Sequence, residues 1–335
     1  MSGVFLARRL LLAIPTLLGV ALIVFVLMRV VPGDPIAMMT GLNATPADIE
    51  RLRALHGFDQ SIFTQFVFYL ENILQGDFGT SITRRQPVAD LVLSRLPATL
   101  ELSVAAMIFA IIIGVFLATA ATLWRGRVAE RMADGFSALG LAIPDFLWGL
   151  IFILVLGVML PILPISGRID PRLGFEGKSG LYLVESFFTG QFAAFLSVAE
   201  HMILPAAALA LPLAAIIARV LKSSLGDAMR QDYVLLARVK GFSRARIVTR
   251  DALRNALVPT VTLTAVQFTF LVGGTVLVER IFGYPGLGNM AIEAVVNRDL
   301  PLIQGIVITF AVIFIALNIA IDMTYALLDP RLRHG

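Results

Sequence analysis

One polar stretch decides the fold: residues 222–259, KSSLGDAMRQDYVLLARVKGFSRARIVTRDALRNALVP. Apolar runs flank it on both sides, so it is a hydrophilic interval between two hydrophobic segments. Near its start four apolar side chains recur at helical spacing: Leu225, Met229, Tyr233 and Leu236. This spacing predicts one amphipathic helix over residues 225–240.

A tight turn and a second helix are expected to follow. Gly241 is suited to ending the first helix, because glycine adopts the left-handed conformation without steric cost. Ser243 is then a candidate N-cap for a second helix that ends at Leu257. Three basic residues share one face of this second helix: Arg246, Arg250 and Arg254. On periodicity alone, the stretch is equally compatible with an amphipathic hairpin lying on the anionic inner leaflet of a membrane.

The composition identifies an integral membrane protein. Of the 335 residues, 58% are hydrophobic, and the mean hydropathy is +0.87. The net charge of +4 does not predict a nucleic-acid partner, because the basic residues concentrate between apolar runs. Absence of cysteine excludes disulfides, thiolate catalysis and cysteine-ligated metal. The three histidines lie far apart in the sequence, so we expect no metal site.

Six apolar runs predict an all-α protein with six transmembrane helices. The runs cover residues 10–30, 98–122, 136–162, 202–221, 257–279 and 302–328. A run of about 20 residues crosses the hydrocarbon core of a bilayer. The first run follows Arg8 and Arg9 and is longer than the apolar core of a secretory signal, so we interpret it as an uncleaved anchor.

Basic residues predict the orientation. With the N-terminus inside, residues 1–9, 123–135, 222–256 and 329–335 hold 15 Lys and Arg in 64 positions, against 10 in 128 for the outer segments. Lys and Arg are enriched in cytosolic loops. Both termini and the polar stretch are therefore expected in the cytosol.

The first outer segment is expected to form a helical subdomain. Thr45 and Pro46 predict the start of a helix over residues 46–56, and a second helix is expected over residues 60–75 before Gly76. A further outer segment, residues 279–288, contains turn residues and is expected to restart as a short helix through Arg298.

Four ionisable residues lie within or near the apolar runs: Glu101, Asp145, Arg219 and Asp322. Charged groups inside a bilayer are costly and need a partner or a water-filled cavity. We expect Glu101 and Asp322 to lie close enough to a surface to be solvated. Asp145 follows Pro144 and is the better candidate for a cavity. Small residues recur every fourth position at Ala206, Ala210, Ala214 and Ala218, which predicts a tightly packed helix face.

Catalytic motifs are not found. Gly177-Lys178-Ser179 resembles the end of a P-loop, but Arg172 stands where the required glycine would be. No Gly-x-Ser-x-Gly elbow occurs. The chain is therefore not expected to be an enzyme. A proton-coupled secondary transporter is the alternative class, although neither repeated halves nor several buried acids are evident.

Motifs of the polar stretch, in their order along the chain, resemble the cytoplasmic coupling loop of ABC importer permeases. The resemblance is strongest to the dipeptide, oligopeptide and nickel family. The matching residues are Asp232-Tyr233, Ala237-Arg238, Lys240-Gly241 and Ser243. The generic loop begins Glu-Ala-Ala where this chain has Leu235-Leu236-Ala237, and Val239 replaces a usual alanine. Four further segments also resemble this family: residues 31–35, 76–81, 279–288 and 326–331. Within the family, the chain is most similar to the first permease subunit of dipeptide importers.

The resemblance implies a type I ABC importer (MetI-like) transmembrane domain over residues 97–328. It would follow an N-terminal span with an outer helical region, residues 1–96, and precede a short cytosolic tail, residues 329–335. The implied partners are a second permease, two subunits that bind ATP and Mg, an extracytoplasmic substrate-binding protein and membrane lipid. No cofactor is expected in this chain.

The resemblance also assigns roles to residues. It implies that an ATPase contacts Asp232, Tyr233, Ala237, Arg238, Lys240 and Gly241, with Pro259 as the joint into the fifth span. Asp145 and Gln267 are candidates for the translocation path. Dipeptides or short oligopeptides are the expected cargo, with nickel, glutathione or haem as alternatives within the family.

Overall fold

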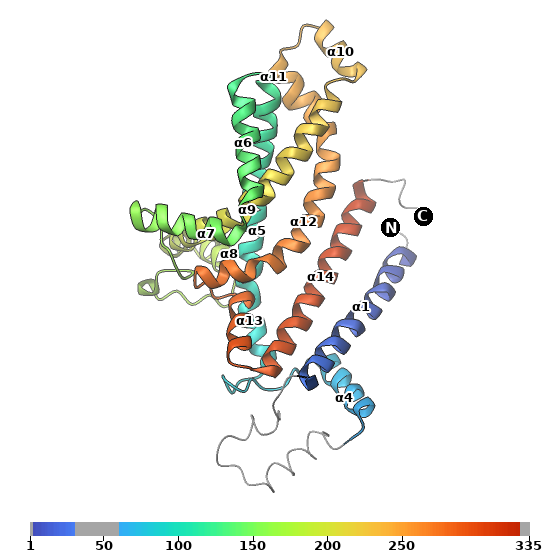
Figure 1. Cartoon of the computed structure of the whole chain (residues 1–335), viewed down its shortest axis with the longest axis vertical. Helices are drawn as coiled ribbons and strands as arrows, with labels where there is room; N and C mark the ends of the chain where they lie inside the picture. The colour runs from blue at the N-terminus through green and yellow to red at the C-terminus, as the bar shows by residue number, and fades with distance from the viewer. Residues whose placement is uncertain (1–2, 31–59, 329–335) are drawn as a thin grey trace. The chain divides into compact units, whose positions relative to one another are not determined.

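The computed structural model describes residues 3–30 and 60–328, and all regular structure in these ranges is helical (Figure 1). An isolated bridge between Thr80 and Pro87 is the one β-type pairing among them. The chain divides into two compact units, residues 1–96 with 290–335, and residues 97–289.

The first unit contains α1 (Gly3–Val30), α4 (Ile62–Leu74) and α14 (Leu300–Leu328), with α1 packed against both of the others. The hydroxyl of Ser61 caps α4 by accepting the N–H of Thr64 at 3.2 Å, and Gly76 follows the helix with φ +78°. The ring of Phe25 in α1 lies 5.0 Å from Phe66 in α4. The helix predicted over residues 60–75 is therefore confirmed, whereas the one over residues 46–56 lies outside the described ranges.

The second unit is organised around one long helix, α9 (Phe192–Ala228), which packs against α6, α7, α8 and α12. Two helices cross the boundary between the units: α5 (Val88–Leu123) and α13 (Leu287–Val296). The other elements are α6 (Val128–Ala142), α7 (Asp145–Phe152), η1 (Ile153–Met159), η2 (Pro171–Leu173), α8 (Tyr182–Phe188), α10 (Asp232–Val239), α11 (Arg244–Arg246), η3 (Ile247–Ala252) and α12 (Leu253–Ile281).

The small-residue face of α9 lies in the core of the second unit. Its four alanines at positions 206, 210, 214 and 218 are at most 4% exposed. A methyl group on Gly114 of α5 would lie 2.7 Å from the side chain of Ile217, and one on Gly140 of α6 would lie 3.1 Å from the carbonyl oxygen of Leu211. Small side chains thus allow close helix contacts, and the predicted packing face is confirmed.

Fewer straight spans are found than the sequence predicts. In the described ranges four helical segments are long and apolar enough to cross a membrane: α5, α9, Arg244–Ile281 and Leu300–Ile321. The predicted run over residues 136–162 is not one helix, because α6 and the segment Asp145–Met159 meet at 106°. Ile143 is extended and Pro144 has no N–H to donate, which interrupts the helical ladder there. Within α1 the apolar helical segment Leu11–Leu27 is shorter than the other spans.

The polar stretch also differs from its prediction. The single helix expected over residues 225–240 is wrong: α9 ends at Ala228, a turn follows, and α10 starts at Asp232 (Figure 1). The second helix does not end at Leu257 but continues without a break to Ile281. Pro259 lies inside this helix and not at a joint between two helices. Membrane-spanning helices tolerate proline because neighbouring groups satisfy the backbone carbonyl that loses its hydrogen bond.

Candidate coupling site and buried polar junctions

The helix α10, the turn at Gly241 and the helical segment of α11 and η3 form a hairpin. One face of α10 is buried inside this hairpin, and the other face is exposed. Val234 is fully buried and Ala237 is 8% exposed, and both pack with Ile247 of η3. The opposite face carries Leu235, Leu236 and Val239, whose exposed fractions are 60%, 54% and 78%. No described part of the chain covers this apolar face, which makes it a candidate docking surface.

A bonded turn closes the hairpin after α10. Gly241 has φ +78°, as predicted, and its N–H donates to the carbonyl of Arg238 at 2.9 Å. Ser243 accepts the N–H of Arg246 at 3.4 Å, which confirms it as the N-cap of the following helix. The guanidinium of Arg246 lies 3.8 Å from the centre of the Phe242 ring. The turn is thus held by several local contacts rather than by its glycine alone.

The base of the hairpin is packed onto three long helices. Ala118 of α5, Leu221 and Leu225 of α9 and Ala252 form one buried apolar cluster with Ala256 of α12. In addition, Arg244 donates to the carbonyl oxygen of Thr122 at 2.9 Å, near the C-terminal end of α5. Packed side chains and one charged hydrogen bond thus connect the base of the hairpin to α5, α9 and α12.

The structure places the predicted coupling residues in different environments. Asp232, Tyr233, Arg238, Lys240 and Gly241 are exposed along α10 and its turn. By contrast, Ala237 points into the hairpin, and Pro259 lies in α12, away from α10 along the chain. The exposed leucines and valine of α10 were not among the predicted contacts. Their i, i+1, i+4 spacing was the signal that could have identified them.

The two candidate path residues are not brought together. Asp145 is the first residue of α7, at the bend, and its Oδ1 accepts the N–H of Phe146 at 2.7 Å. A methyl group on Gly274 of α12 would lie 3.9 Å from Oδ2 of Asp145, so this carboxylate faces α12. Gln267 lies on α12 two turns before Gly274, a separation of about 10 Å along the helix.

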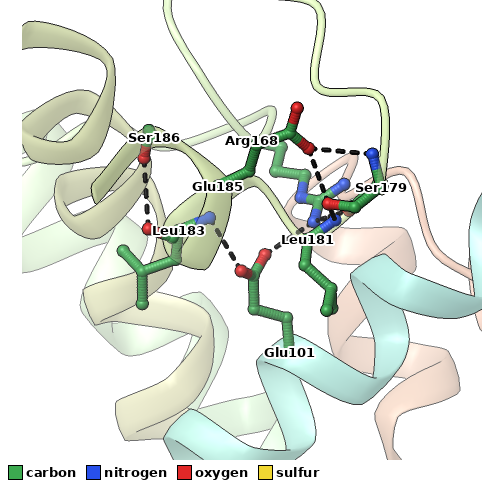
Figure 2. Close-up of polar contacts among 8 residues, drawn as sticks. Glu101, Arg168, Ser179, Leu181, Leu183, Glu185 and Ser186 are labelled. Carbon is green, nitrogen blue, oxygen red and sulfur yellow. Dashed lines mark hydrogen bonds and ion pairs between the residues drawn. The ribbon is translucent and has the colours of Figure 1, made fainter. Parts of the chain in front are cut away.

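A buried ion pair joins the loop before α8 in the second unit to α5. Figure 2 shows Arg168 directed toward Glu101, with Nη2 of Arg168 2.6 Å from Oε2 of Glu101 and each side chain at most 6% exposed. The second carboxylate oxygen of Glu101 accepts the N–H of Leu183 at 2.7 Å. Arg168 also donates to the carbonyl of Gly180 at 2.6 Å, and its guanidinium lies 4.1 Å from the centre of the Tyr182 ring. The expectation that Glu101 is solvated is wrong, because the folded loop covers it and supplies the counter-charge.

Glu185 contacts the same loop through Ser179 (Figure 2). Its carboxylate accepts the hydroxyl of Ser179 at 2.6 Å and the backbone N–H groups of Ser179 and Lys178, each at 2.8 Å. These hydrogen bonds, the Ser179 hydroxyl foremost, lower the pKa of Glu185 below its ordinary value. The loop that carries Arg168 is therefore internally bonded as well as fixed to α5.

A second buried carboxylate joins α12 to the start of α13. Glu279 is fully buried, accepts the hydroxyl of Thr99 at 2.7 Å and accepts the N–H of Asn289 at 3.0 Å. The hydroxyl of Thr99 also accepts the N–H of Leu287 at 2.8 Å. A side chain on Gly286 would collide with this carboxylate. A negative charge is favourable at a helix N-terminus, so Glu279 fixes the turn between α12 and α13.

In the first unit Asp299 caps α14 and holds residues 81–83. It is fully buried, accepts the hydroxyl of Ser81 at 2.5 Å and accepts the N–H groups of Thr83 at 3.0 Å and Ile82 at 3.2 Å. Burial raises the pKa of Asp299, but the hydrogen bonds from Ser81, Thr83 and Ile82 outweigh it, so the pKa lies below its ordinary value.

This depressed pKa predicts acid sensitivity of residues 81–83. A carboxyl group with a lowered pKa in the folded state stabilises the protein above the ordinary aspartate pKa of about 3.9, and this contribution is lost as the pH falls through the lower, folded-state pKa. We expect amide protection at Ile82 and Thr83, measured by hydrogen exchange, to fall in this acidic range. In Asp299→Asn, protection should be lower at pH 6 and independent of pH. An unchanged pH profile in this variant would contradict the assignment.

The described residues contain no group of three or more His, Cys, Asp and Glu side chains that could hold a metal ion. The charged residues found in this part of the chain serve as helix caps, loop anchors and exposed surface.

Comparisons with known proteins agree with this description. The family model described as the inner membrane component of binding-protein-dependent transport systems matches residues 110–334. The model for the N-terminal part of such components matches residues 3–103. Together the two models cover nearly the whole chain.

Full-length relatives identify the branch. The chain is 40% identical over 332 residues to the di/tripeptide transport system permease protein DppB of Pseudomonas aeruginosa, covering 98% of both chains. It is 36% identical to the dipeptide permease DppB of Escherichia coli K12 (98% of both), and 36% identical to the glutathione permease GsiC of the same strain (98% of this chain and 99% of GsiC). The chain therefore belongs to the family of inner membrane components of binding-protein-dependent transport systems, as a DppB-like ABC permease.

Proposed function

We propose that this chain forms half of the membrane path of an ABC importer for dipeptides or short oligopeptides. A second permease subunit would supply the other half. Two partner subunits would bind and hydrolyse ATP with Mg, and an extracytoplasmic binding protein would deliver the cargo. The similarity to dipeptide permeases over 98% of both chains carries this proposal.

The hairpin of α10 is the proposed contact with the ATPase. Its outer face presents Leu235, Leu236 and Val239, which fit an apolar groove, while Tyr233 and Lys240 lie at the border of this face. ATP-driven closure of the partner subunits would displace α10. The packed base of the hairpin would then rotate α5, α9 and α12, so that the path opens alternately to the two sides.

The topology belongs to the same proposal. Six spans require α1 and the bent segment of α6, α7 and η1 to cross the membrane in addition to the four long helices. Both termini and α10 would lie in the cytosol of a bacterial cell, on the side where Lys and Arg are enriched.

The cargo is proposed from the relatives. Two of the relatives named above are permeases of di/tripeptide and dipeptide transport systems, which favours short peptides here. Glutathione is the second candidate, because a glutathione permease is 36% identical over the full length. Glutathione is itself a tripeptide, so it is similar in size to a short peptide. Like a short peptide, it carries a free amino group and a terminal carboxylate.

Copurification and uptake together test the function. The tagged chain is purified in mild detergent, and its partners are identified by mass spectrometry. We expect a second permease and two ATPases with P-loops, and dipeptide uptake in proteoliposomes that depends on ATP and on the binding protein. A chain that transports alone, driven by a proton gradient, would contradict the proposal. If glutathione is taken up in preference to dipeptides, glutathione replaces dipeptides as the proposed cargo.

A further inference from the structure

Asp145 is a carboxylate in an apolar segment that has no partner in another element. Apart from Asp145 itself, residues 141–152 are apolar or glycine. Its Oδ1 accepts the N–H of Phe146, and no ion pair or hydrogen bond joins the carboxylate to another described element. By contrast, the carboxylates of Glu101 and Glu279 are each bonded to groups from other elements. A carboxylate at membrane depth needs a partner or water, so Asp145 is a candidate for binding a cation that the chain itself does not supply.

With the orientation of the proposed function, on which this inference rests, Asp145 lies inside the hydrocarbon region. Asp134 pairs with Lys222 at the cytosolic end of α6, and Asp145 follows at the bend between α6 and α7 (Figure 1). From Asp134 to Ala142 the helix rises about 12 Å, at 1.5 Å per residue. The hydrocarbon core is about 30 Å thick, so the carboxylate is well away from both surfaces.

An open notch in α12 faces this carboxylate. A methyl group on Gly274 would lie 3.9 Å from Oδ2 of Asp145, and one on Gly273 would meet no atom within 4 Å. Gly114 and Gly140, in contrast, are needed for close helix contacts. Glycine weakens a helix interior relative to alanine. Two adjacent glycines without a packing contact therefore indicate that the room beside the carboxylate is kept open.

The carboxylate and the notch together suit a small cationic group carried on a narrow backbone. The amino group of a short peptide is mostly protonated at neutral pH, and it can donate to Oδ2 of Asp145 in a charge-assisted hydrogen bond. The peptide backbone beside this amino group can approach α12 closely where side chains are absent. A lysine or arginine of a partner subunit would reach the carboxylate on a long side chain without a cleared stretch of α12, so the notch favours the peptide.

We propose that Asp145 and the notch at Gly273 and Gly274 bind the protonated amino group of the peptide during its passage through the membrane. The site selects cargo with a free N-terminus. It also holds the peptide at one depth while the path changes the side to which it opens.

Carbodiimide labelling tests the site without measuring transport. The complete complex in lipid nanodiscs is treated with dicyclohexylcarbodiimide, which modifies carboxyl groups in apolar surroundings, and the labelled fraction of Asp145 is measured by mass spectrometry. We expect excess dialanine to reduce this fraction about fivefold. N-acetyl-dialanine lacks the ammonium group and should leave the fraction unchanged.

Two results of the labelling would overturn the proposal. Equal protection by the two peptides would mean that the ammonium group is not recognised. If Asp145 of the complex is not labelled even without peptide, a partner subunit or lipid covers the carboxylate and the notch is not a cargo site.

Uptake by two variants tests the two parts of the site. Asp145→Asn keeps an acceptor for the N–H of Phe146 but removes the charge, whereas Gly274→Leu fills the notch and keeps the charge. We expect each variant to reduce ATP-dependent dialanine uptake in proteoliposomes about tenfold. The matched controls are Glu200→Gln and Gly135→Leu, because both residues are exposed and a methyl group on Gly135 meets no atom within 4 Å. Both controls should retain their uptake.

The site and the proposed function fail separately. Unchanged uptake by Asp145→Asn would overturn the site and leave the proposed function in place. A wild-type complex without ATP-dependent peptide uptake would instead contradict the proposed function. If Asp145→Asn does not assemble with its partners, the labelling of the wild-type complex decides.

Discussion

Gly241→Pro is expected to reduce ATP-dependent uptake at least tenfold while the chain still inserts in the membrane. Gly241 has φ +78°, whereas proline requires φ near −65°. Proline would also remove the N–H that bonds the carbonyl of Arg238 at 2.9 Å. The turn after α10 must then open, and α10 loses its fixed direction relative to η3. The apolar spans do not include this turn, so insertion should be unaffected.

Gly241→Asn is the matched control, because asparagine tolerates the left-handed conformation and the space around a side chain at this position is open. We expect this variant to retain most of its uptake. Uptake and ATP hydrolysis are measured in proteoliposomes that contain the complete complex, and membrane insertion is measured by extraction with carbonate. Normal ATP-coupled uptake by Gly241→Pro would contradict the proposal that the hairpin transmits force from the ATPase to the spans.

Arg168→Met should have the largest effect on stability. The variant leaves the Glu101 carboxylate buried without its cation, and breaking a buried ion pair from one side costs about 3–5 kcal/mol. The loop of residues 163–190 would also lose the bond from Arg168 to the carbonyl of Gly180. We expect a lower thermal midpoint in detergent and faster proteolysis of this loop.

A double-mutant cycle separates the pair from its surroundings. Glu101→Gln leaves Arg168 without a carboxylate but keeps an acceptor for the N–H of Leu183. When both substitutions are combined, no buried charge is left unpaired, so most of the lost stability should return. A single variant within about 1 kcal/mol of the wild type would show that water reaches this pair and that it does not hold the loop.

Local sequence signals were reliable where one residue type determines the conformation. Gly241 and Gly76 take the left-handed conformation, and Ser243 caps the helix that follows it. The face of small residues on α9 was readable because a spacing of four places them on one side of any helix. In the candidate coupling site, the turn and the exposed charged residues were therefore predictable.

Features that depend on contacts between distant residues were not predictable from local signals. The stripe that begins at Leu225 suggested one helix, but Leu225 packs with Ala118 of α5, whereas Leu236 is exposed on a separate helix. Periodicity alone does not distinguish a continuous helix from two short ones when both halves are apolar at the same spacing. The turn between Ala228 and Asp232 is set by what each half packs against.

By itself, the sequence determined the helical membrane class, the positions of the apolar runs, the glycine turn and the family, because these depend on local composition and on ordered motifs. Only the tertiary structure decided the bend after α6, the orientation of α10 and the partners of the buried carboxylates. Glu101 and Arg168 are separated by 67 positions in the chain, and Thr99 and Glu279 by 180. The cost of burying a charge selects a partner in space, and no local pattern encodes which residue the folded chain brings there.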